Sequence, residues 1–368
     1  MTGPDPGATG PDSRPDAPAS APVVAAARSG RLRAATFARW EVLLVVILGL
    51  LVLEGTSVSK FFATGPNFAN LTSAAMEVAI MALPMTLIIV TGEIDLSVES
   101  MVGLSSAILG WLWAAGVPLE IAIPVVLVVG ALGGLLNGIL VARAALPSLV
   151  VTLGTLALFR GLANVILGTR AISTFPAGFT AFGFGNLPGT SVPWTLLVFG
   201  LLGIVFWVAT HGTWLGRHVF AVGKNKETAL FSGVHVSTLK TGLFVLNGLV
   251  AALAGVILTA RFSSARADNG TGLTLTVITI VLLGGVDING GKGTIPGVIL
   301  AVFTLAVLQN ALRLAGVSSE YQGVAVGLLL IVSVAAPYLA RQVRSFTGRT
   351  RMRRRLPAGS ATPGEVVT

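Results

Sequence analysis

Six polar side chains stand inside long apolar stretches of this sequence, and they are the first candidates for chemistry. They are Glu77, Asn137, Arg160, Asn164, Asn247 and Gln309. A charged or amide group is costly to bury among apolar residues, so it is a candidate functional group by default. Amide groups bind the hydroxyl groups of a solute, although hydrogen bonding between helices is their commoner role. We take the six as candidates for lining a path for a polar solute.

No nucleophile, base or metal-ligand pattern accompanies these side chains. Cysteine is absent, which excludes disulfides, thiolate metal sites and a cysteine nucleophile. The three histidines fall in one polar loop and show no metal-ligand spacing with aspartate. We therefore expect neither catalysis, nor a metal site, nor a cofactor bound by this chain itself.

The elements that position the six residues are predicted to be membrane helices. Apolar residues make up 54% of the chain and charged residues 11%, whereas soluble proteins carry about 25% charged residues. A membrane-spanning helix needs roughly 20 apolar residues. Ten segments meet or approach this length, near residues 40–56, 69–91, 98–116, 119–142, 148–168, 193–211, 240–262, 272–285, 293–313 and 319–339. The sequence predicts an all-α polytopic membrane helix bundle in which the eighth span is short.

Lys and Arg predict the orientation of the bundle. With ten spans both tails lie on one side, which carries 18 Lys and Arg residues against five on the other. The positive-inside rule then places both termini in the cytoplasm. We expect a disordered cytoplasmic tail over residues 1–38, a transmembrane domain over 39–340 and a basic cytoplasmic tail over 341–368. Basic residues beside spans are explained by this rule, so no nucleic-acid partner is expected.

Two of the six polar residues are predicted to form an ion pair. Glu77 and Arg160 each lie about eight residues from the outer end of their span, which is roughly 12 Å of helix. Opposite charges at matching depth would neutralise each other in lipid. Gly130, Gly133, Gly134 and Gly138 are expected to let helix backbones approach closely.

A short sequence after the second span recurs after the eighth, which predicts an internal repeat. The matched residues are Gly92, Asp95 and Ser97 in the first copy and Gly284, Asp287 and Asn289 in the second. Transporters often contain such repeats, with the substrate path between them. The aspartates are expected to cap the following helices, with lining of an inner gate as the alternative. The glycine-rich segment 290–293 lacks the phosphate-loop pattern, so no nucleotide site is expected.

The polar loop over residues 211–240 predicts a short helix that needs a partner surface. Asn225 suits its N-cap, Glu227 its first turn and Gly233 its end. A helix of about two turns is unstable alone in water. The residues predicted to form this contact are Lys224, Asn225, Glu227, Ala229, Leu230, Ser232 and Gly233. Packing of the helix on its own bundle is the alternative.

Several of these motifs together resemble one family. Residues 82–98, which contain Thr-Gly-Glu-Ile-Asp-Leu-Ser-Val, resemble the Gly-Gly-Ile-Asp-Leu-Ser-Val-Gly signature of ribose/xylose-type ABC permeases. Residues 146–161, 216–233 and 283–297 resemble the same family, so the likeness runs from about residue 40 to 339. Within it, the chain is most similar to the rhamnose and autoinducer permeases. Glu93 replaces the second glycine of the signature, which argues against ribose itself.

The resemblance implies an ATP-driven importer. It implies a second permease chain, alike or different, a sugar-binding protein outside, and two cytoplasmic ATPase subunits that bind ATP and dock on the short helix. The expected solute is a monosaccharide, rhamnose or a related sugar, carried across the cytoplasmic membrane. The alternatives are an ion-coupled secondary sugar transporter, or an ABC permease for autoinducer or branched-chain amino acids.

Overall fold

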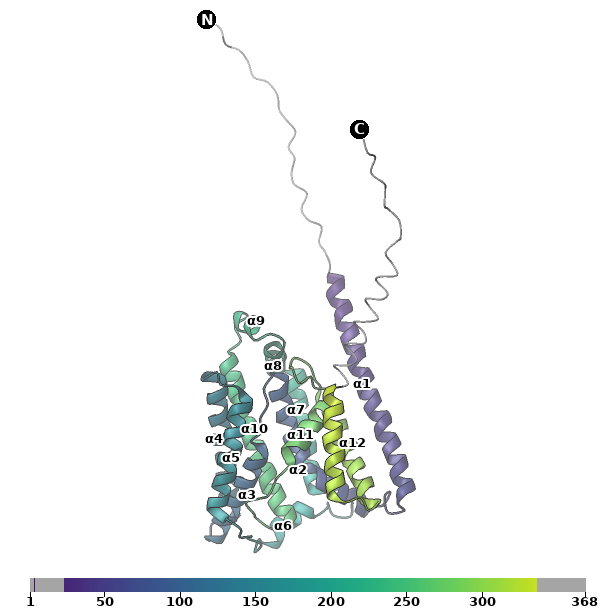
Figure 1. Cartoon of the computed structure of the whole chain (residues 1–368), viewed down its shortest axis with the longest axis vertical. Coiled ribbons are helices and arrows are strands. Elements are labelled where there is room, and N and C mark those ends of the chain that lie inside the picture. Colours follow the sequence, from purple (N-terminus) through teal and green to yellow (C-terminus); the bar gives the residue numbers. More distant parts are fainter. Residues whose placement is uncertain (1–2, 4–22, 336–368) are drawn as a thin grey trace, which may run out of the picture. The chain divides into compact units, whose positions relative to one another are not determined.

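The computed structural model describes residue 3 and residues 23–335 (Figure 1). The chain divides into two units, Met1–Arg39 and Trp40–Thr368. Residues 23–39 of the first unit are helical and begin helix α1 (Val23–Val58). Most of the tail predicted to be disordered lies outside the described residues, and its last part is helical. The predicted basic tail also lies outside them.

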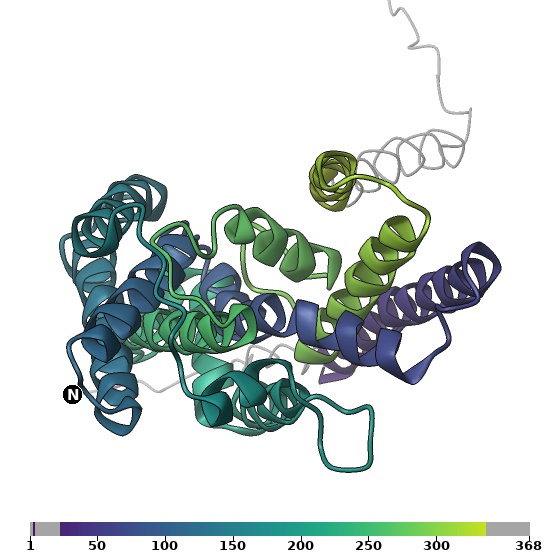
Figure 2. The same cartoon turned by 90° about the horizontal axis from the view of Figure 1, so that it is seen from below.

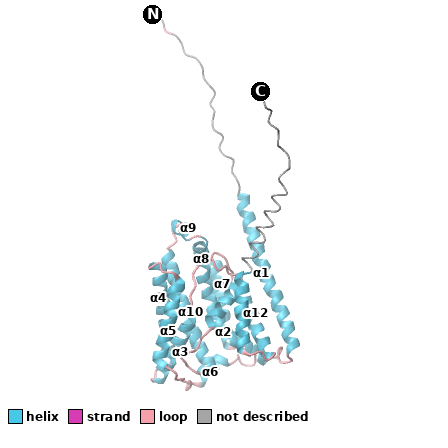
Figure 3. Ribbon diagram, viewed as in Figure 1, coloured by secondary structure: helices cyan, strands magenta, loops and turns pink. Residues whose placement is uncertain are grey.

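The second unit is a bundle of helices (Figure 3). Apart from two isolated bridges, its described residues contain no strand. After α1 the helices are α2 (Gly65–Val90), α3 (Val98–Ala114), α4 (Leu119–Gly138) with the π-helical turn η1 (Ile139–Arg143), α5 (Ser148–Leu167), α6 (Ala177–Phe184), α7 (Trp194–Gly212), α8 (Trp214–Lys224), α9 (Lys226–Phe231), α10 (Val236–Phe262), α11 (Leu273–Leu283), α12 (Ile295–Leu314) and a final helix over Ser319–Ala335.

The predicted fold class is confirmed, and each of the ten predicted spans falls on a helix. In the described part of the chain, seven helices are long and apolar enough to cross a membrane. The other three predicted spans correspond to shorter apolar helices, α3, α11 and Ser319–Ala335. The span expected to be short, α11, has 11 residues, or about 16 Å, roughly half of a bilayer core.

Helices α2 and α10 form the centre of this unit. Of their most apolar windows, 89% and 78% of residues are buried, against 11% in Trp40–Val58 of α1. Helix α10 packs against α2, α3, α4 and α6. Seen end-on, α4 and α5 (blue to teal) lie at the opposite edge of this unit from its part of α1, Trp40–Val58 (Figure 2). The exposed apolar side chains of the outer helices suit lipid contact.

Glycines let α4 and α10 approach each other closely, as the sequence predicts. A Cβ atom at Gly134 would overlap the backbone of Phe244, and one at Gly248 would overlap the backbone of Gly130. Gly138 lies against Thr241 in the same way. Because apolar side chains gain little by leaving lipid for protein, this close backbone packing is a main source of attraction between the two helices.

Valine at Gly134 should therefore destabilise the bundle, because its side chain has no room against Phe244. Overpacking costs about 1–3 kcal/mol, so the Tm of the purified protein in detergent should fall by at least about 3 °C. Gly200→Val on α7 is the matched control, since nothing lies within 4 Å of its new Cβ. Equal Tm values for the two variants would contradict close packing of α4 on α10.

Candidate functional site

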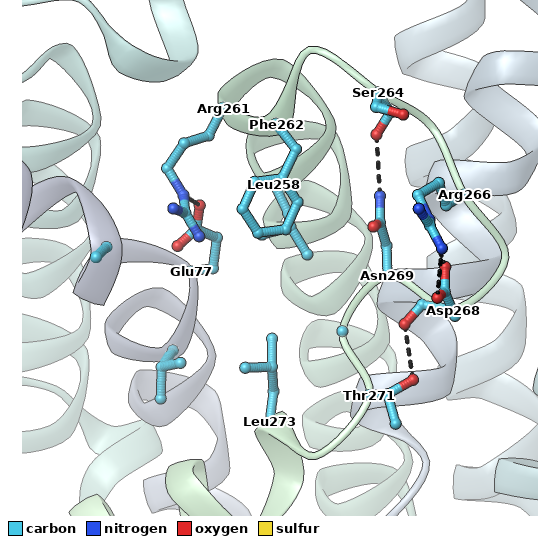
Figure 4. A pocket seen from close by; sticks show the side chains of 13 residues that line it. Glu77, Leu258, Arg261, Phe262, Ser264, Arg266, Asp268, Asn269, Thr271 and Leu273 are labelled. Carbon is cyan, nitrogen blue, oxygen red and sulfur yellow. Dashed lines mark hydrogen bonds and ion pairs between the residues drawn. The ribbon is translucent and has the colours of Figure 1, made fainter. Parts of the chain in front are cut away.

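A pocket of about 580 Å³ lies between α2, α10 and the connection from α10 to α11 (Figure 4). Its lining comes from residues 74–78 of α2, residues 258–262 of α10, and residues 264–273. These segments are nearly 200 positions apart in the sequence and meet because α2 and α10 pack together. The pocket has the volume of an ordinary small-molecule site.

The pocket lies at the opposite end of α10 from α9. Helix α10 starts five residues after α9 and has 27 residues, so it is roughly 40 Å long. Arg261 and Phe262, at its far end, line the pocket. The unit therefore has a hollow at one end and the short helix α9 at the other (Figure 1).

An ion pair joins the two central helices at the pocket. Arg261 Nε donates to Glu77 Oε1 at 2.6 Å, and the Glu77 side chain is only 2% exposed. The predicted pairing of Glu77 with Arg160 is therefore wrong. Matching depth along two helices does not fix the direction in which their side chains point, and Arg160 of α5 points to another element.

Arg160 instead holds the connection that forms one wall of the pocket. Its Nη1 atom donates to the carbonyl of Ala267 at 2.6 Å. From α3, Ser106 Oγ accepts hydrogen bonds from Asn269 Nδ2 at 2.9 Å and from Arg266 N at 3.3 Å. The wall is thus fastened by α5 and α3 and has a defined shape.

The same connection ends at Glu99, in the first turn of α3. The carboxylate Oε2 of Glu99 accepts the backbone N–H groups of Gly272 and Thr274, each at 3.1 Å. These N–H groups belong to the first turn of α11 and have no partner inside that helix. Glu99 therefore caps α11, which explains why a carboxylate stands at the start of the apolar helix α3.

A second ion pair lies on the connection itself. Arg266 donates to both carboxylate oxygens of Asp268, at 2.8 and 2.9 Å. The hydrogen bonds from Arg266 hold the pKa of the Asp268 carboxyl below its usual value, so it stays charged at neutral pH. The pocket therefore has two pairs of opposite charges and no net charge.

The first predicted repeat loop forms a buried polar network instead of capping α3. Asp95 Oδ1 accepts from Ser97 N at 2.9 Å and from Ser97 Oγ at 2.6 Å, while its Oδ2 accepts from Asn247 Nδ2 at 2.8 Å. Asn137 Nδ2 donates to Ser97 Oγ at 2.9 Å. Helix α3 has no side-chain cap, so the capping prediction is wrong for Asp95: its bonds go to the residue before the helix.

The second repeat loop has the same turn in another setting. Asp287 Oδ1 accepts from Asn289 N at 3.2 Å, as Asp95 does from Ser97 N, and Lys292 pairs with Oδ2 at 3.0 Å. Thr294, not Asp287, caps α12, so this capping prediction is also wrong. The segment 290–293 separates Asp287 from the helix.

The predicted alignment of the two loops holds at the aspartates but is one residue out at the glycines. Gly92 ends α2 at φ +80°, but Gly285, not Gly284, has the matching conformation after α11, at φ +87°. In each case the next residue's N–H returns to the helix five residues back. The second loop is therefore one residue shorter between its glycine and its aspartate.

These loops meet on the α9 side of the bundle. Gly291 N donates to the carbonyl of Val90 at 2.8 Å, and a Cβ atom at Gly223 of α8 would overlap both residues. Glu93, next to this junction, pairs with Lys240 of α10. The end of α2, the connection from α11 to α12, and α8 thus form one layer.

The predicted short helix is confirmed as α9. Asn225 Oδ1 accepts from Thr228 N at 2.8 Å, and Gly233 follows the helix at φ +84°. Ala229 is buried, whereas Leu230 is 58% and Phe231 90% exposed. The other predicted contact residues are also exposed, namely Lys224, Asn225, Glu227, Ser232 and Gly233. Phe231 was not among the predicted contact residues. It lies two residues after the buried Ala229 and therefore on a different, exposed face of the helix.

The six polar candidates separate into different environments. Glu77 lines the pocket, and Arg160 fastens its wall from outside. Asn137 and Asn247 belong to the Asp95 network, each with a buried Oδ1 that has no partner among the described residues. Asn164 is exposed on α5 and Gln309 is half-buried on α12. In the described part of the chain, no three His, Asp or Glu residues are placed to hold a metal ion.

Comparison with known proteins decides the family. The family model described as branched-chain amino acid transport system / permease component matches residues 67–334. The chain belongs to this family of ABC transporter permeases. It is similar to the autoinducer 2 import system permease protein LsrD of Yersinia enterocolitica, with 39% identity over 302 residues that cover 80% of this chain and 90% of the relative.

Other relatives of the ABC permease give the same result. LsrD of Escherichia coli strain K12 is 38% identical over 307 residues, which cover 80% of this chain and 91% of the relative. LsrD of Yersinia pseudotuberculosis strain YPIII is 38% identical over 302 residues. No solved structure shows a significant match. The permease is thus a multi-pass membrane protein of the sugar-type ABC class.

A double-mutant cycle should confirm the pairing of Glu77 with Arg261. Arg261→Gln leaves a buried carboxylate unpaired, which should cost about 3 kcal/mol of stability. Glu77→Gln together with Arg261→Gln should cost clearly less than the sum of the single changes. Glu77→Gln with Arg160→Gln is the control and should be additive in thermal unfolding. Coupling of Glu77 to Arg160 instead would contradict the observed geometry.

Exchanging the carboxylate of Asp95 and the amide of Asn247 between their two positions should test the Asp95 network. Asp95→Asn places an amide donor against the Asn247 amide and should lower stability by about 1–3 kcal/mol. Adding Asn247→Asp restores a donor–acceptor pair and should recover part of the loss. Thermal unfolding in detergent measures both. No recovery in the double variant would mean that these two side chains do not bond.

Proposed function

We propose that this permease is the membrane subunit of an ATP-driven importer for a small polyhydroxy solute, of the class of autoinducer 2 or a related sugar such as rhamnose. The observation that carries the proposal is the exposed apolar pair Leu230 and Phe231 on α9. An apolar side chain left 90% exposed on a two-turn helix is costly in water and suits a protein partner.

ATPase subunits would bind at α9, on the cytoplasmic side of the inner membrane. The excess of Lys and Arg on the side of α9 supports this orientation. Val90 and Gly291 contact Gly223 of α8, which is followed directly by α9, so a movement of α9 would reach the end of α2 and the connection that leads to α12. ATP would be bound by the partners, because this chain lacks a phosphate loop.

A second permease chain is proposed for the exposed face of α5. Asn164 is exposed on this membrane helix, and nothing lies within 4 Å of a Cβ atom at Gly154 or Gly161. An amide group facing lipid would be unfavourable, whereas a second helix would supply a partner for it. The glycines would let that helix approach.

The pocket lies at the end of the bundle opposite α9, and with α9 in the cytoplasm this position supports import of a solute from outside. The pocket then opens outside, where a solute-binding protein would deliver its ligand. An ion-coupled transporter needs a carboxylate that releases its partner during the cycle. Glu77 and Asp95, the two buried carboxylates on α2 and the loop after it, are each bonded to side chains of α10.

Reconstitution in proteoliposomes with the ATPase subunits and the binding protein tests the proposal. Uptake of labelled autoinducer 2 or L-rhamnose should require ATP. The double change Leu230→Ala and Phe231→Ala should lower ATPase binding and uptake at least about tenfold, because exposed anchors of this kind carry much of an interface's affinity.

Phe61→Ala is the matched control, because Phe61 is an exposed phenylalanine just before the start of α2, and it is the other end of α2, at Val90, that meets α8. It should leave ATPase binding unchanged. Uptake that proceeds without ATP would refute the importer. Normal ATPase binding by the α9 variant would place the docking surface elsewhere.

A further inference from the structure

We infer that the pocket between α2 and α10 is a binding site for an uncharged, polyhydroxylated solute as it passes from the binding protein into the permease. This rests on the proposed import function, which by itself assigns no residue to the solute. The site consists of the Glu77–Arg261 pair, the Arg266–Asp268 pair, and the ring of Phe262.

The Glu77–Arg261 pair offers hydrogen bonds of both kinds at one point. Only the Nε atom of Arg261 is used by Glu77. Among the described residues, its two Nη atoms have no hydrogen-bond partner, and the side chain is 21% exposed at the pocket. A carboxylate beside a guanidinium accepts from one hydroxyl group and donates to the next, which suits neighbouring hydroxyls on a carbon skeleton.

The charges of the pocket favour a neutral ligand. Each arginine already faces a carboxylate, so the field of one cation is largely cancelled by its neighbour. An anionic ligand would have to compete with Glu77 for Arg261, inside a site from which water is partly excluded. A neutral polyol bonds to both partners without breaking the pair.

An aromatic surface completes the site. The Phe262 ring lines the pocket, is 53% exposed, and lies 4.5 Å from the guanidinium of Arg261. Figure 4 shows the ring between the Glu77–Arg261 pair and the connection that carries Arg266 and Asp268. The C–H face of a sugar-like molecule packs on such a ring while its hydroxyls reach the polar side chains.

The absence of cysteine allows a direct test in the full complex, with its ATPase and binding protein, in right-side-out vesicles. Ala74→Cys places a single thiol in the pocket lining, and Thr271→Cys places one at its exposed edge. Lys60→Cys, exposed in the connection from α1 to α2, is the control. A membrane-impermeant thiol reagent is applied with and without saturating autoinducer 2, L-rhamnose or D-ribose.

At least one of these solutes, supplied with the binding protein, should slow labelling of the Ala74→Cys thiol at least about threefold and leave the Lys60→Cys thiol unaffected. The Thr271→Cys variant supplies the same measurement if the first variant does not fold. The inference is overturned if the solutes are imported yet protect neither pocket thiol. It is also overturned if the binding protein without solute protects equally well, since the pocket is then a docking surface. Failure of the complex that contains the unsubstituted permease to import any of the three counts instead against the proposed function.

Discussion

The buried carboxylate of Asp95 holds together the part of the bundle where the chain turns from α2 into α3. The loop between α2 and α3 enters the protein interior, so its polar groups must be satisfied by side chains. Asp95 bonds to Ser97 in the loop and to Asn247 of α10, and Asn137 of α4 joins through Ser97. Ser148 Oγ of α5 accepts from the N–H of Ile94 at 3.3 Å. Because α4, α5 and α10 are all hydrogen-bonded to this loop, the position of α10 in the bundle, and with it the pocket, depends on these bonds.

The features set by local sequence could be predicted. Span positions follow from runs of apolar residues, and α9 follows from a capping asparagine and a terminating glycine. The charge of Glu77 inside a span makes it a candidate for lining a solute path, but the sequence does not identify its partner. Helical depth can be counted along a sequence, whereas the direction in which Glu77 points depends on how α2 and α10 pack. The pocket itself joins residues 74–78 to 258–273, and nothing local relates those segments.

The repeat illustrates a second limit of sequence comparison. The aspartates of the two loops adopt the same turn, yet Asp95 lies in the interior while Asp287 pairs with Lys292 near the surface. One residue fewer between glycine and aspartate, and a glycine-rich segment before α12, account for the difference in surroundings. The sequence similarity of the two loops therefore predicted that Asp95 and Asp287 share a local conformation, but it did not show that their roles differ. Glu99, in the first turn of α3, acquires its role from the start of α11, some 170 positions later.

Helix α10 connects the two ends of the permease as a single rigid rod. It begins just after α9 and ends at Arg261, roughly 40 Å away. A tilt of about 5° around its α9 end would displace Arg261 by roughly 3 Å over such a length. A displacement of that size away from Glu77 would break their 2.6 Å hydrogen bond, so a small rotation at one end of α10 would be enough to open a polar contact at the other. In such a rotation the length of α10 would amplify the displacement at its far end.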